Sequence, residues 1–234
     1  MNVLFRYRTV LAAAIACVTL AMPMAGYAQK SEYPMHPVKV VVPFVPGGNA
    51  DSTARIFAEA YAKHLGQPFV VDNKGGAGGM IGAAQMVRSE ADGYTIMIGT
   101  TAPIVASWQM AGRSANYSLK DMTPIALLTQ VPGVIVVNAS SPIKSYQDLV
   151  AFAKSRPGRL TFGHPGNGTA GHVNILQMQK AISQQFVVAA YKGAGPAVQE
   201  LLGGQLDAVA TDLPSTLQLI KGWTLLHKSL LFQR

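Results

Sequence analysis

The chain has 234 residues, which is enough for one large domain or two small ones. Apolar residues make up 49% of it and charged residues 13%, so the chain can fill a hydrophobic core and is not a disordered segment. The formal net charge is +8, but the Lys and Arg residues are scattered and form no basic run. This pattern argues against a nucleic-acid partner and favours either small anionic ligands or solubility alone.

Residues 1–28 have the pattern of a secretory signal peptide. Arg6 and Arg8 give a basic start, residues 10–20 are apolar, and Gly26-Tyr27-Ala28 offers small residues where a signal peptidase cuts. The apolar run is short for a membrane span. An uncleaved anchor and a lipoprotein cut before Cys17 are the alternatives. Cleavage after Ala28 would remove the only cysteine and leave a mature chain without disulfides.

The part of the chain after the signal peptide begins with alternating strands and helices. The expected strands are 38–42, 69–71 and 94–98, and the expected helices are 51–65 and 80–89. The short connections predict a parallel sheet covered by helices. Ligands bind beyond the carboxyl ends of such strands, which is where the loops 43–49 and 99–101 lie.

A second unit repeats this order of elements. Residues 125–138 are a long apolar stretch broken at Pro132-Gly133, which predicts two strands and a hinge. Further strands are expected at 160–162, 186–189 and 206–210, and helices at 145–155, up to Ser183, up to Leu202, and from Pro214 onward. The fold class is therefore α/β. We expect lobe 1 at 33–132 and lobe 2 at 133–222, with a ligand cleft between them.

The loop Pro46-Gly47-Gly48 is the first candidate for ligand binding. It joins the strand 38–42 to a helix whose first turn contains Asp51. Backbone N–H groups and the helix dipole make such a turn a site for a small anion, most simply a carboxylate. The alternative is a tight turn without a ligand, in which Asp51 serves only the helix N-terminus.

Catalytic and metal-binding motifs are absent from the sequence. The glycines at 75–82 miss the dinucleotide spacing, and there is no phosphate loop or nucleophile elbow. The five histidines show no metal-ligand spacing. We therefore expect a protein that is not an enzyme and that has no cofactor and no metal.

A set of short motifs follows in a fixed order along residues 33–221. The motifs are 43–48 with Asp51 and Arg55, 67–68, 70–73, 76–79, 92–95, 166–169 with His172, 191–193, and 202–205 with Asp207. Each motif alone is weak. The ordered set resembles the tripartite tricarboxylate transporter receptor family, also called Bug proteins, which are periplasmic solute-binding proteins.

The resemblance implies a periplasmic-binding-protein-like fold with two lobes. Each lobe would be a mainly parallel sheet flanked by helices, and the two lobes would close on a small organic acid. The resemblance places ligand contacts on both lobes: Phe44, Pro46, Gly47, Gly48, Gly99 and Thr100 on the first, and His164, Gly166, Asn167, Gly168 and Thr169 on the second. Asp51 and Lys192 are further candidates, since Lys192 could meet a carboxylate across the cleft. Asp212 could pair with an amine on the ligand. The family usually has small serines at the positions of His164 and Pro165, so a different ligand, or weaker binding, is expected.

The resemblance also implies partners and a location. A monomer in the periplasm would carry a di- or tricarboxylate, an acidic amino acid or an aromatic acid to membrane permease subunits. The alternatives are a ligand-sensing partner of a membrane receptor kinase and a truncated, non-functional remnant. The remnant is considered because residues 223–234 do not match the family. We therefore expect the second crossover and the C-terminal return to lobe 1 to be missing, with reduced stability.

Overall fold

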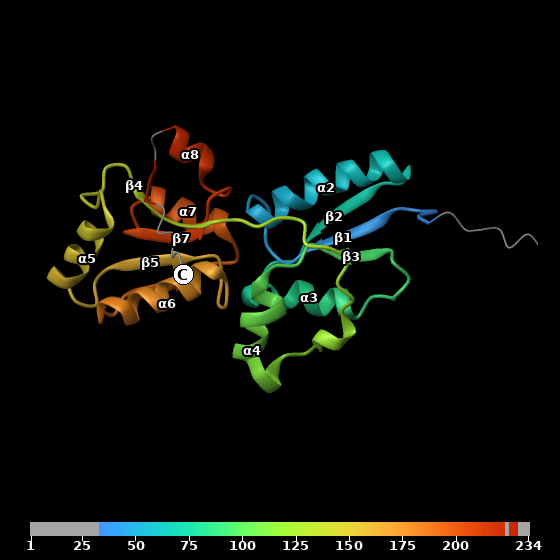
Figure 1. Cartoon of the computed structure of the whole chain (residues 1–234), viewed down its shortest axis with the longest axis horizontal. Helices are drawn as coiled ribbons and strands as arrows, with labels where there is room; N and C mark the ends of the chain where they lie inside the picture. Colours follow the sequence, from blue (N-terminus) through green and yellow to red (C-terminus); the bar gives the residue numbers. More distant parts are fainter. Residues whose placement is uncertain (1–32, 223–224, 229–234) are drawn as a thin grey trace, which may run out of the picture. The chain divides into compact units, whose positions relative to one another are not determined.

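The computed structural model describes residues 33–222 and 225–228 (Figure 1). The predicted signal peptide lies outside the described residues, as does most of the predicted tail. Within the described ranges, none of the helices has the length and apolar character needed to cross a membrane. Residues from Pro34 onward group into one compact unit, so the division into two lobes at residue 133 remains a prediction.

The first sheet has three parallel strands in the order β2-β1-β3. They are β1 (Val38–Val42), β2 (Phe69–Asn73) and β3 (Thr95–Met97). Val40 in the central strand lies opposite Val71 on one side and Ile96 on the other. A central strand of a parallel sheet is buried on both faces, which explains its nearly continuous run of valines. The predicted strands and their parallel order are confirmed.

Helices cover both faces of this sheet (Figure 1). One face packs against α2 (Asn49–Leu65), through Val40, Val42 and Ala54. The other packs against α3 (Met80–Val87) and α4 (Ser107–Ala111). Gly66 ends α2 in the left-handed conformation, at φ +72°, which a residue with a side chain rarely adopts.

The chain then passes to the second sheet through short helical turns and an extended segment. The turns are η2, a π-helix (Ala102–Ala106), and the 3₁₀ helices η3 (Gly112–Ser114) and η4 (Leu119–Asp121). The prediction of two strands in 125–138 is wrong, because only β4 (Gly133–Asn138) forms. Residues 123–131 pair with no strand among the described residues, and Ile125 is 80% exposed. An apolar pattern cannot report whether a partner strand is present.

The second sheet has five strands in the order β6-β5-β7-β4-β8. Besides β4, they are β5 (Thr161–His164), β6 (Val187–Ala190), β7 (Ala208–Asp212) and β8 (Leu225–Lys228). β5 runs parallel to β6 and β7, whereas β4 is antiparallel to β7 and β8. The prediction of a mainly parallel sheet therefore holds for the first sheet and for three strands of the second.

The second sheet is flanked by four helices: α5 (Tyr146–Ser155), α6 (Ala170–Ile182), α7 (Ala194–Leu202) and α8 (Leu217–Lys221). Alternate residues of β4 enter different cores: Ile135 packs with α5 and α6, and Val136 with α7. The prediction that Pro214 opens a helix is wrong, since α8 begins at Leu217. Asp212 accepts a hydrogen bond from the Ser215 N–H at 3.1 Å, so these residues form a turn before the helix.

Candidate functional site

A cavity of about 550 Å³ lies at the carboxyl ends of strands from both sheets. This volume is in the range of sites for small molecules. Its lining includes Phe44, Gly48 to Ala50 and Thr53 from the first loop and α2, Met97 at the end of β3, and residues 98–102 after it. The remaining lining residues are 126–131, Gly133, Pro165, Thr169 to Gly171, Ala194, Thr211 and Asp212. The cavity thus draws on the sheet edge at which the sequence placed a ligand.

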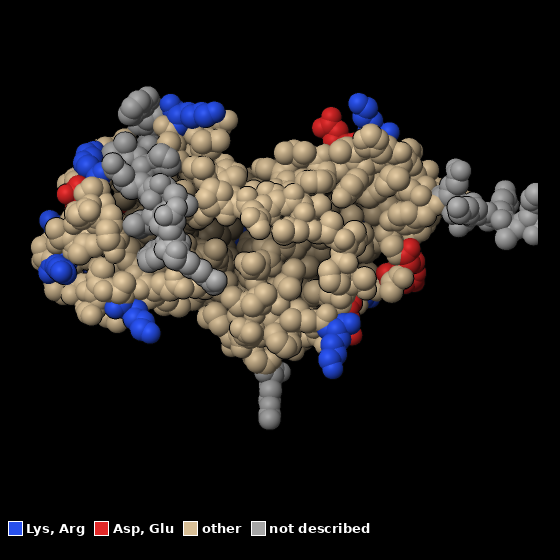
Figure 2. Space-filling view, viewed as in Figure 1, with Lys and Arg blue, Asp and Glu red and all other residues tan. Residues whose placement is uncertain are grey.

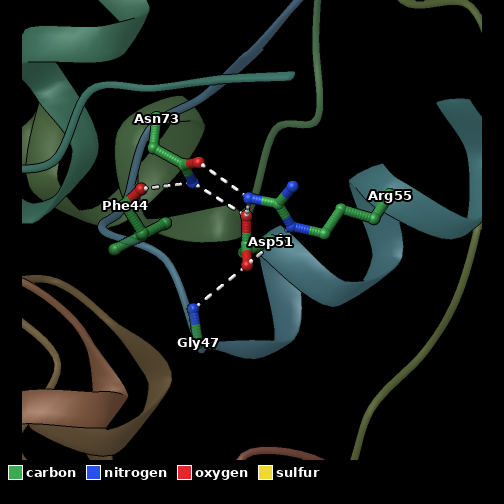
Figure 3. Close-up of polar contacts among 5 residues, drawn as sticks. All are labelled: Phe44, Gly47, Asp51, Arg55 and Asn73. Atoms are coloured by element: carbon green, nitrogen blue, oxygen red, sulfur yellow. Dashed lines mark hydrogen bonds and ion pairs between the residues drawn. The ribbon is translucent and has the colours of Figure 1, made fainter. Parts of the chain in front are cut away.

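The loop between β1 and α2 is braced from behind by three polar side chains (Figure 3). The Asp51 carboxylate accepts a hydrogen bond from the Gly47 N–H at 3.0 Å and from Asn73 Nδ2 at 3.1 Å, and it pairs with Arg55 at 3.0 Å. Asn73 Nδ2 also donates to the Phe44 carbonyl at 3.0 Å. The brace therefore fixes both ends of the Phe44–Gly47 loop.

Asp51 serves this brace and does not line the cavity. Asp51 is only 5% exposed to solvent. Burial alone would raise the pKa of Asp51, but hydrogen bonds from Arg55, Gly47 and Asn73, with the charge of Arg55, outweigh burial and lower the pKa. The carboxylate therefore stays charged and holds the loop.

Three helix N-termini converge on the cavity. Gly48 precedes α2, Thr169 precedes α6, and Ala194 is the first residue of α7; all three line the cavity. The first-turn N–H groups of a helix have no partner within the helix and carry partial positive charge. No side chain caps α2 or α7, because Gly48 and Gly193 stand at their N-cap positions. Such an arrangement attracts an anion without any cationic side chain.

Two hydroxyl groups in the cavity wall have no hydrogen-bond partner within the described part of the chain. They are Thr100 Oγ1, after β3, and Thr211 Oγ1, on β7, and both are buried. A buried hydroxyl that lacks a partner is costly. These hydroxyls are suited to donate to a bound oxyanion.

Asp212 is the one charged side chain among the described residues that line the cavity. Burial raises its pKa, and hydrogen bonds from the Ser215 side chain and backbone lower it again in part. Ser215 Oγ donates to Asp212 Oδ1 at 2.6 Å and accepts from the Asn49 N–H at 3.1 Å. Asp212 is thus linked through Ser215 to the N-terminus of α2.

The loop 164–169 is held together by internal hydrogen bonds. The Gly166 N–H donates to His164 Nδ1 at 3.1 Å, and the Gly168 N–H donates to His172 Nδ1 at 3.1 Å. Thr169 Oγ1 donates to the Gly166 carbonyl at 2.7 Å. The two imidazole rings stack with their centroids 4.5 Å apart. Both Nδ1 atoms accept hydrogen bonds, so this arrangement requires neutral histidines.

Burial, followed by the proximity of His172, lowers the pKa of His164 to about 4. Burial also lowers the pKa of His172. His164 is 1% exposed and does not line the cavity. It therefore supports the loop through its hydrogen bond with Gly166 without lining the cavity, as Asp51 does for the first loop.

The structure brings some of the predicted site residues to the cavity and leaves others outside it. Those that line it are Phe44, Gly48, Gly99, Thr100, Thr169 and Asp212. Those outside the lining are Pro46, Gly47, Asp51, His164, Gly166, Asn167, Gly168 and Lys192. Whether any of these residues touches a ligand stays a prediction.

Sequence reasoning missed much of the cavity lining, including Ala170, Gly171, Ala194 and Thr211 on the side of the second sheet. Ala126 to Val131 form one wall, although the prediction assigned them only to a strand and hinge. Asn49 and Thr53 on α2 were not among the predicted contacts, although residue 49 lay in the predicted loop 43–49 and Thr53 inside the predicted helix 51–65. The one available signal was the Asn49-Ala50-Asp51 sequence after the glycines, which is typical of a helix start.

The charged side chains visible in Figure 2 lie around the margin of the face drawn, and the middle of that face, where grey atoms do not cover it, is uncharged. Among the described residues that line the cavity, none is Lys, Arg or His. No group of three or more His, Cys, Asp or Glu side chains in residues 33–222 and 225–228 could hold a metal ion. Among the described lining residues, the groups that could attract an anion are therefore backbone N–H groups and hydroxyls.

Comparison with known proteins identifies relatives of this chain. Residues 53–229 match the family model described as "Tripartite tricarboxylate transporter family receptor". Protein BugT of Bordetella pertussis is 34% identical over 212 residues, which are 90% of this chain and 64% of BugT. The chain thus spans about 64% of the length of this relative. The family match runs past Gly222, so it includes residues that the sequence analysis assigned to a tail outside the family.

Two solved structures have a similar fold and were determined with small acids. The Rhodopseudomonas palustris protein Rpa4515 with adipate superposes with a TM-score of 0.80, at 31% identity, over 83% of this chain and 65% of that one. MatC (Rpa3494) from Rhodopseudomonas palustris with bound malate gives a TM-score of 0.77, at 28% identity, over 83% and 66%. The α/β fold with its two sheets is therefore that of periplasmic binding proteins. This chain belongs to the tripartite tricarboxylate transporter receptor family, the Bug proteins.

Proposed function

We propose that this protein binds a small organic carboxylate in the cavity between its two sheets and delivers it to membrane permease subunits. The observation that carries the proposal is the convergence of the N-termini of α2, α6 and α7 on a cavity without cationic side chains. Membership of the family and the acids bound by two similar proteins, adipate and malate, support the same class of ligand.

The lining favours a ligand with charged ends and an apolar middle. Phe44, Met97 and Leu127 contribute apolar surface, while the helix N-termini and the Thr100 and Thr211 hydroxyls offer hydrogen-bond donors. A short aliphatic dicarboxylate combines both requirements. The proposal places the protein in the periplasm, exported by residues 1–28, as a monomer that needs no cofactor.

A thermal-shift screen tests this proposal. The full chain is melted with adipate, malate, citrate, glutamate and benzoate, each beside its uncharged amide. A ligand that binds only the folded state raises the free energy of unfolding, by roughly 3 kcal/mol at a ligand concentration of a hundred times its Kd. The melting temperature rises accordingly. We expect at least one acid to raise the melting temperature while its amide does not. Absence of a shift with every acid would contradict carboxylate binding.

Asp212 separates acidic amino acids from plain dicarboxylates. Its carboxylate would attract a ligand ammonium group and repel a second ligand carboxylate. Replacing it in Asp212→Asn keeps an oxygen that can accept from Ser215. If the ligand is an acidic amino acid, the substitution should weaken the binding of glutamate about ten-fold or more. If the ligand is a dicarboxylate, the variant should bind adipate more tightly than the original protein does. Calorimetric titration of the original protein and of Asp212→Asn with both acids distinguishes the two cases.

A further inference from the structure

Ser107, the first residue of α4, connects the helices of the first sheet to the loop that precedes α6. It is 5% exposed. Its hydroxyl donates to the Asn167 carbonyl at 2.6 Å and lies 3.1 Å from the Gly78 carbonyl. We call Gly78, Ser107 and residues 166–168 the Ser107 contact. None of these residues lines the cavity.

The Ser107 contact brings backbone against backbone. A Cβ atom on Gly168 would collide with Ser107 Oγ and with the Ser107 backbone, and a Cβ atom on Gly78 would collide with the Asn167 carbonyl. Both glycines also have positive φ, +78° and +62°. Glycine is therefore needed on both sides for the loop to approach this closely.

The loop is tied to α6, because its other side-chain hydrogen bonds stay on the side of the second sheet. His164, Thr169 and His172 hold the loop as described above, and Thr169 also caps α6 by accepting from the His172 N–H at 3.4 Å. Thr169 and the first residues of α6 line the cavity. The bond from Ser107 therefore fixes where the α6 N-terminus lies relative to the first loop.

We propose that Ser107 is a positioning residue for ligand binding, whose hydrogen bond to Asn167 holds the α6 N-terminus against the first sheet while the cavity is occupied. A second hydrogen bond, from the Asn49 N–H to Ser215 Oγ, joins α2 to the turn after β7, beside Asp212. The Ser107 link acts on the loop that precedes α6, so its loss loosens that loop relative to α4. The role in ligand binding rests on the proposed function, whereas the Ser107 contact is observed in the structure independently of any ligand.

Two variants and one matched control test the proposal in the full chain. Ser107→Ala removes the hydroxyl, and Gly168→Ala blocks the contact by collision. Gly158→Ala is the control for Gly168→Ala: Gly158 has a similar φ, +70°, but a Cβ atom there meets nothing within 4 Å. The control therefore carries the same backbone strain without the collision.

The affinity for adipate and the radius of gyration are measured, the latter by small-angle X-ray scattering without ligand. For Ser107→Ala we expect an approximately five-fold rise in Kd, through a faster off-rate and an unchanged on-rate, which corresponds to one hydrogen bond. For Gly168→Ala we expect a larger rise in Kd and a larger radius of gyration than for Gly158→Ala. A merely structural role would lower the melting temperature without changing the off-rate.

Equal Kd and equal radius of gyration in Gly168→Ala and Gly158→Ala would overturn the proposal. So would an unchanged off-rate in Ser107→Ala. If the unmodified protein binds neither adipate nor any other acid of the screen, the proposed function fails, and Ser107 has no ligand to position. The radius of gyration still decides in that case whether the contact holds the two sides together.

Discussion

Asp51, Arg55 and Asn73 show how a sequence motif can support a site without entering it. Their hydrogen bonds hold the Phe44–Gly47 loop, and none of the three lines the cavity. The spacing of four between Asp51 and Arg55 places them on one face of α2, where an ion pair forms. The sequence motif is therefore explained by loop geometry.

Asp51→Ala should lower the free energy of unfolding by about 2 kcal/mol or more, because it leaves the Gly47 N–H and the Asn73 amide without their buried acceptor. Arg55→Ala should cost less than about 1 kcal/mol, since the Arg55 side chain is 57% exposed. Urea unfolding of both variants measures the difference. Equal losses of free energy of unfolding in the two variants would show that Asp51 contributes to stability through its ion pair with Arg55 and not through the loop.

His164 makes stability depend on pH. Its pKa is about 4 in the folded protein and 6.5 in the unfolded chain. Between these values the unfolded chain takes up a proton that the folded protein does not, so the free energy of unfolding falls as the pH drops from about 6.5 to about 4. The full loss is on the order of 3 kcal/mol, and nothing is lost above about pH 7.

The variant His164→Asn isolates this effect, because the asparagine oxygen can accept from the Gly166 N–H in place of Nδ1 and does not titrate. We expect the difference in free energy of unfolding between the original protein and the variant to change between pH 7 and pH 4.5. Urea titrations at four pH values within that range measure it. Parallel pH profiles for the two proteins would exclude His164 as the source.

At the scale of elements, the segment 123–131 is an extended and largely exposed chain. Leu128 packs against the core of the first sheet, whereas Ile125 is 80% exposed. Side chains three positions apart in an extended segment point to opposite sides. The apolar run that suggested a buried strand is therefore mostly exposed, with Leu128 only partly buried.

Leu128→Ala should lower the free energy of unfolding by about 1 kcal/mol, because it removes partly buried methyl groups that pack against the core of the first sheet. Ile125→Ala, which removes a similar amount of apolar side chain from the exposed side, should change it by less than about 0.5 kcal/mol. Chemical denaturation of the pair distinguishes the two sides. A large loss for Ile125→Ala would show that its side chain is covered in solution.

Most helices and strands could be predicted from the sequence, because their signals are local. A nearly continuous run of valines predicted β1, and Ser145 predicted the start of α5, where its hydroxyl accepts from the Asp148 N–H at 3.0 Å. The antiparallel pairing of β4 with β7 and the missing strand before Gly133 could not be predicted. Both depend on which segment lies alongside, and hydrophobic periodicity does not contain that information.

The candidate site was predictable only where the backbone determines it. Pro46-Gly47-Gly48 located the α2 N-terminus, and Thr169 the α6 N-terminus, because turn and cap residues have characteristic sequences. The wall formed by 126–131, the link from Asp212 through Ser215 to Asn49, and the Ser107 contact join residues far apart in the chain. No local pattern marks such neighbours.

At the scale of the whole molecule, two α/β layers contribute helix N-termini to one cavity. This arrangement supplies several weak positive ends in place of one strong cation. Ionic strength should therefore affect affinity only modestly, since the cavity lining in the described part of the chain contains no Lys or Arg. The central claim is that backbone N–H groups at these helix starts hold the carboxylate.

A titration of the ¹⁵N-labelled full chain with adipate, followed by amide ¹H–¹⁵N correlation spectra, tests this claim most directly. We predict the largest amide shifts at Gly48 to Ala50, Ala170, Gly171 and Ala194, which line the cavity at the three helix starts. Uncharged adipamide should leave these amides unchanged. Shifts confined to residues outside the cavity, or equal shifts with the amide, would contradict the account.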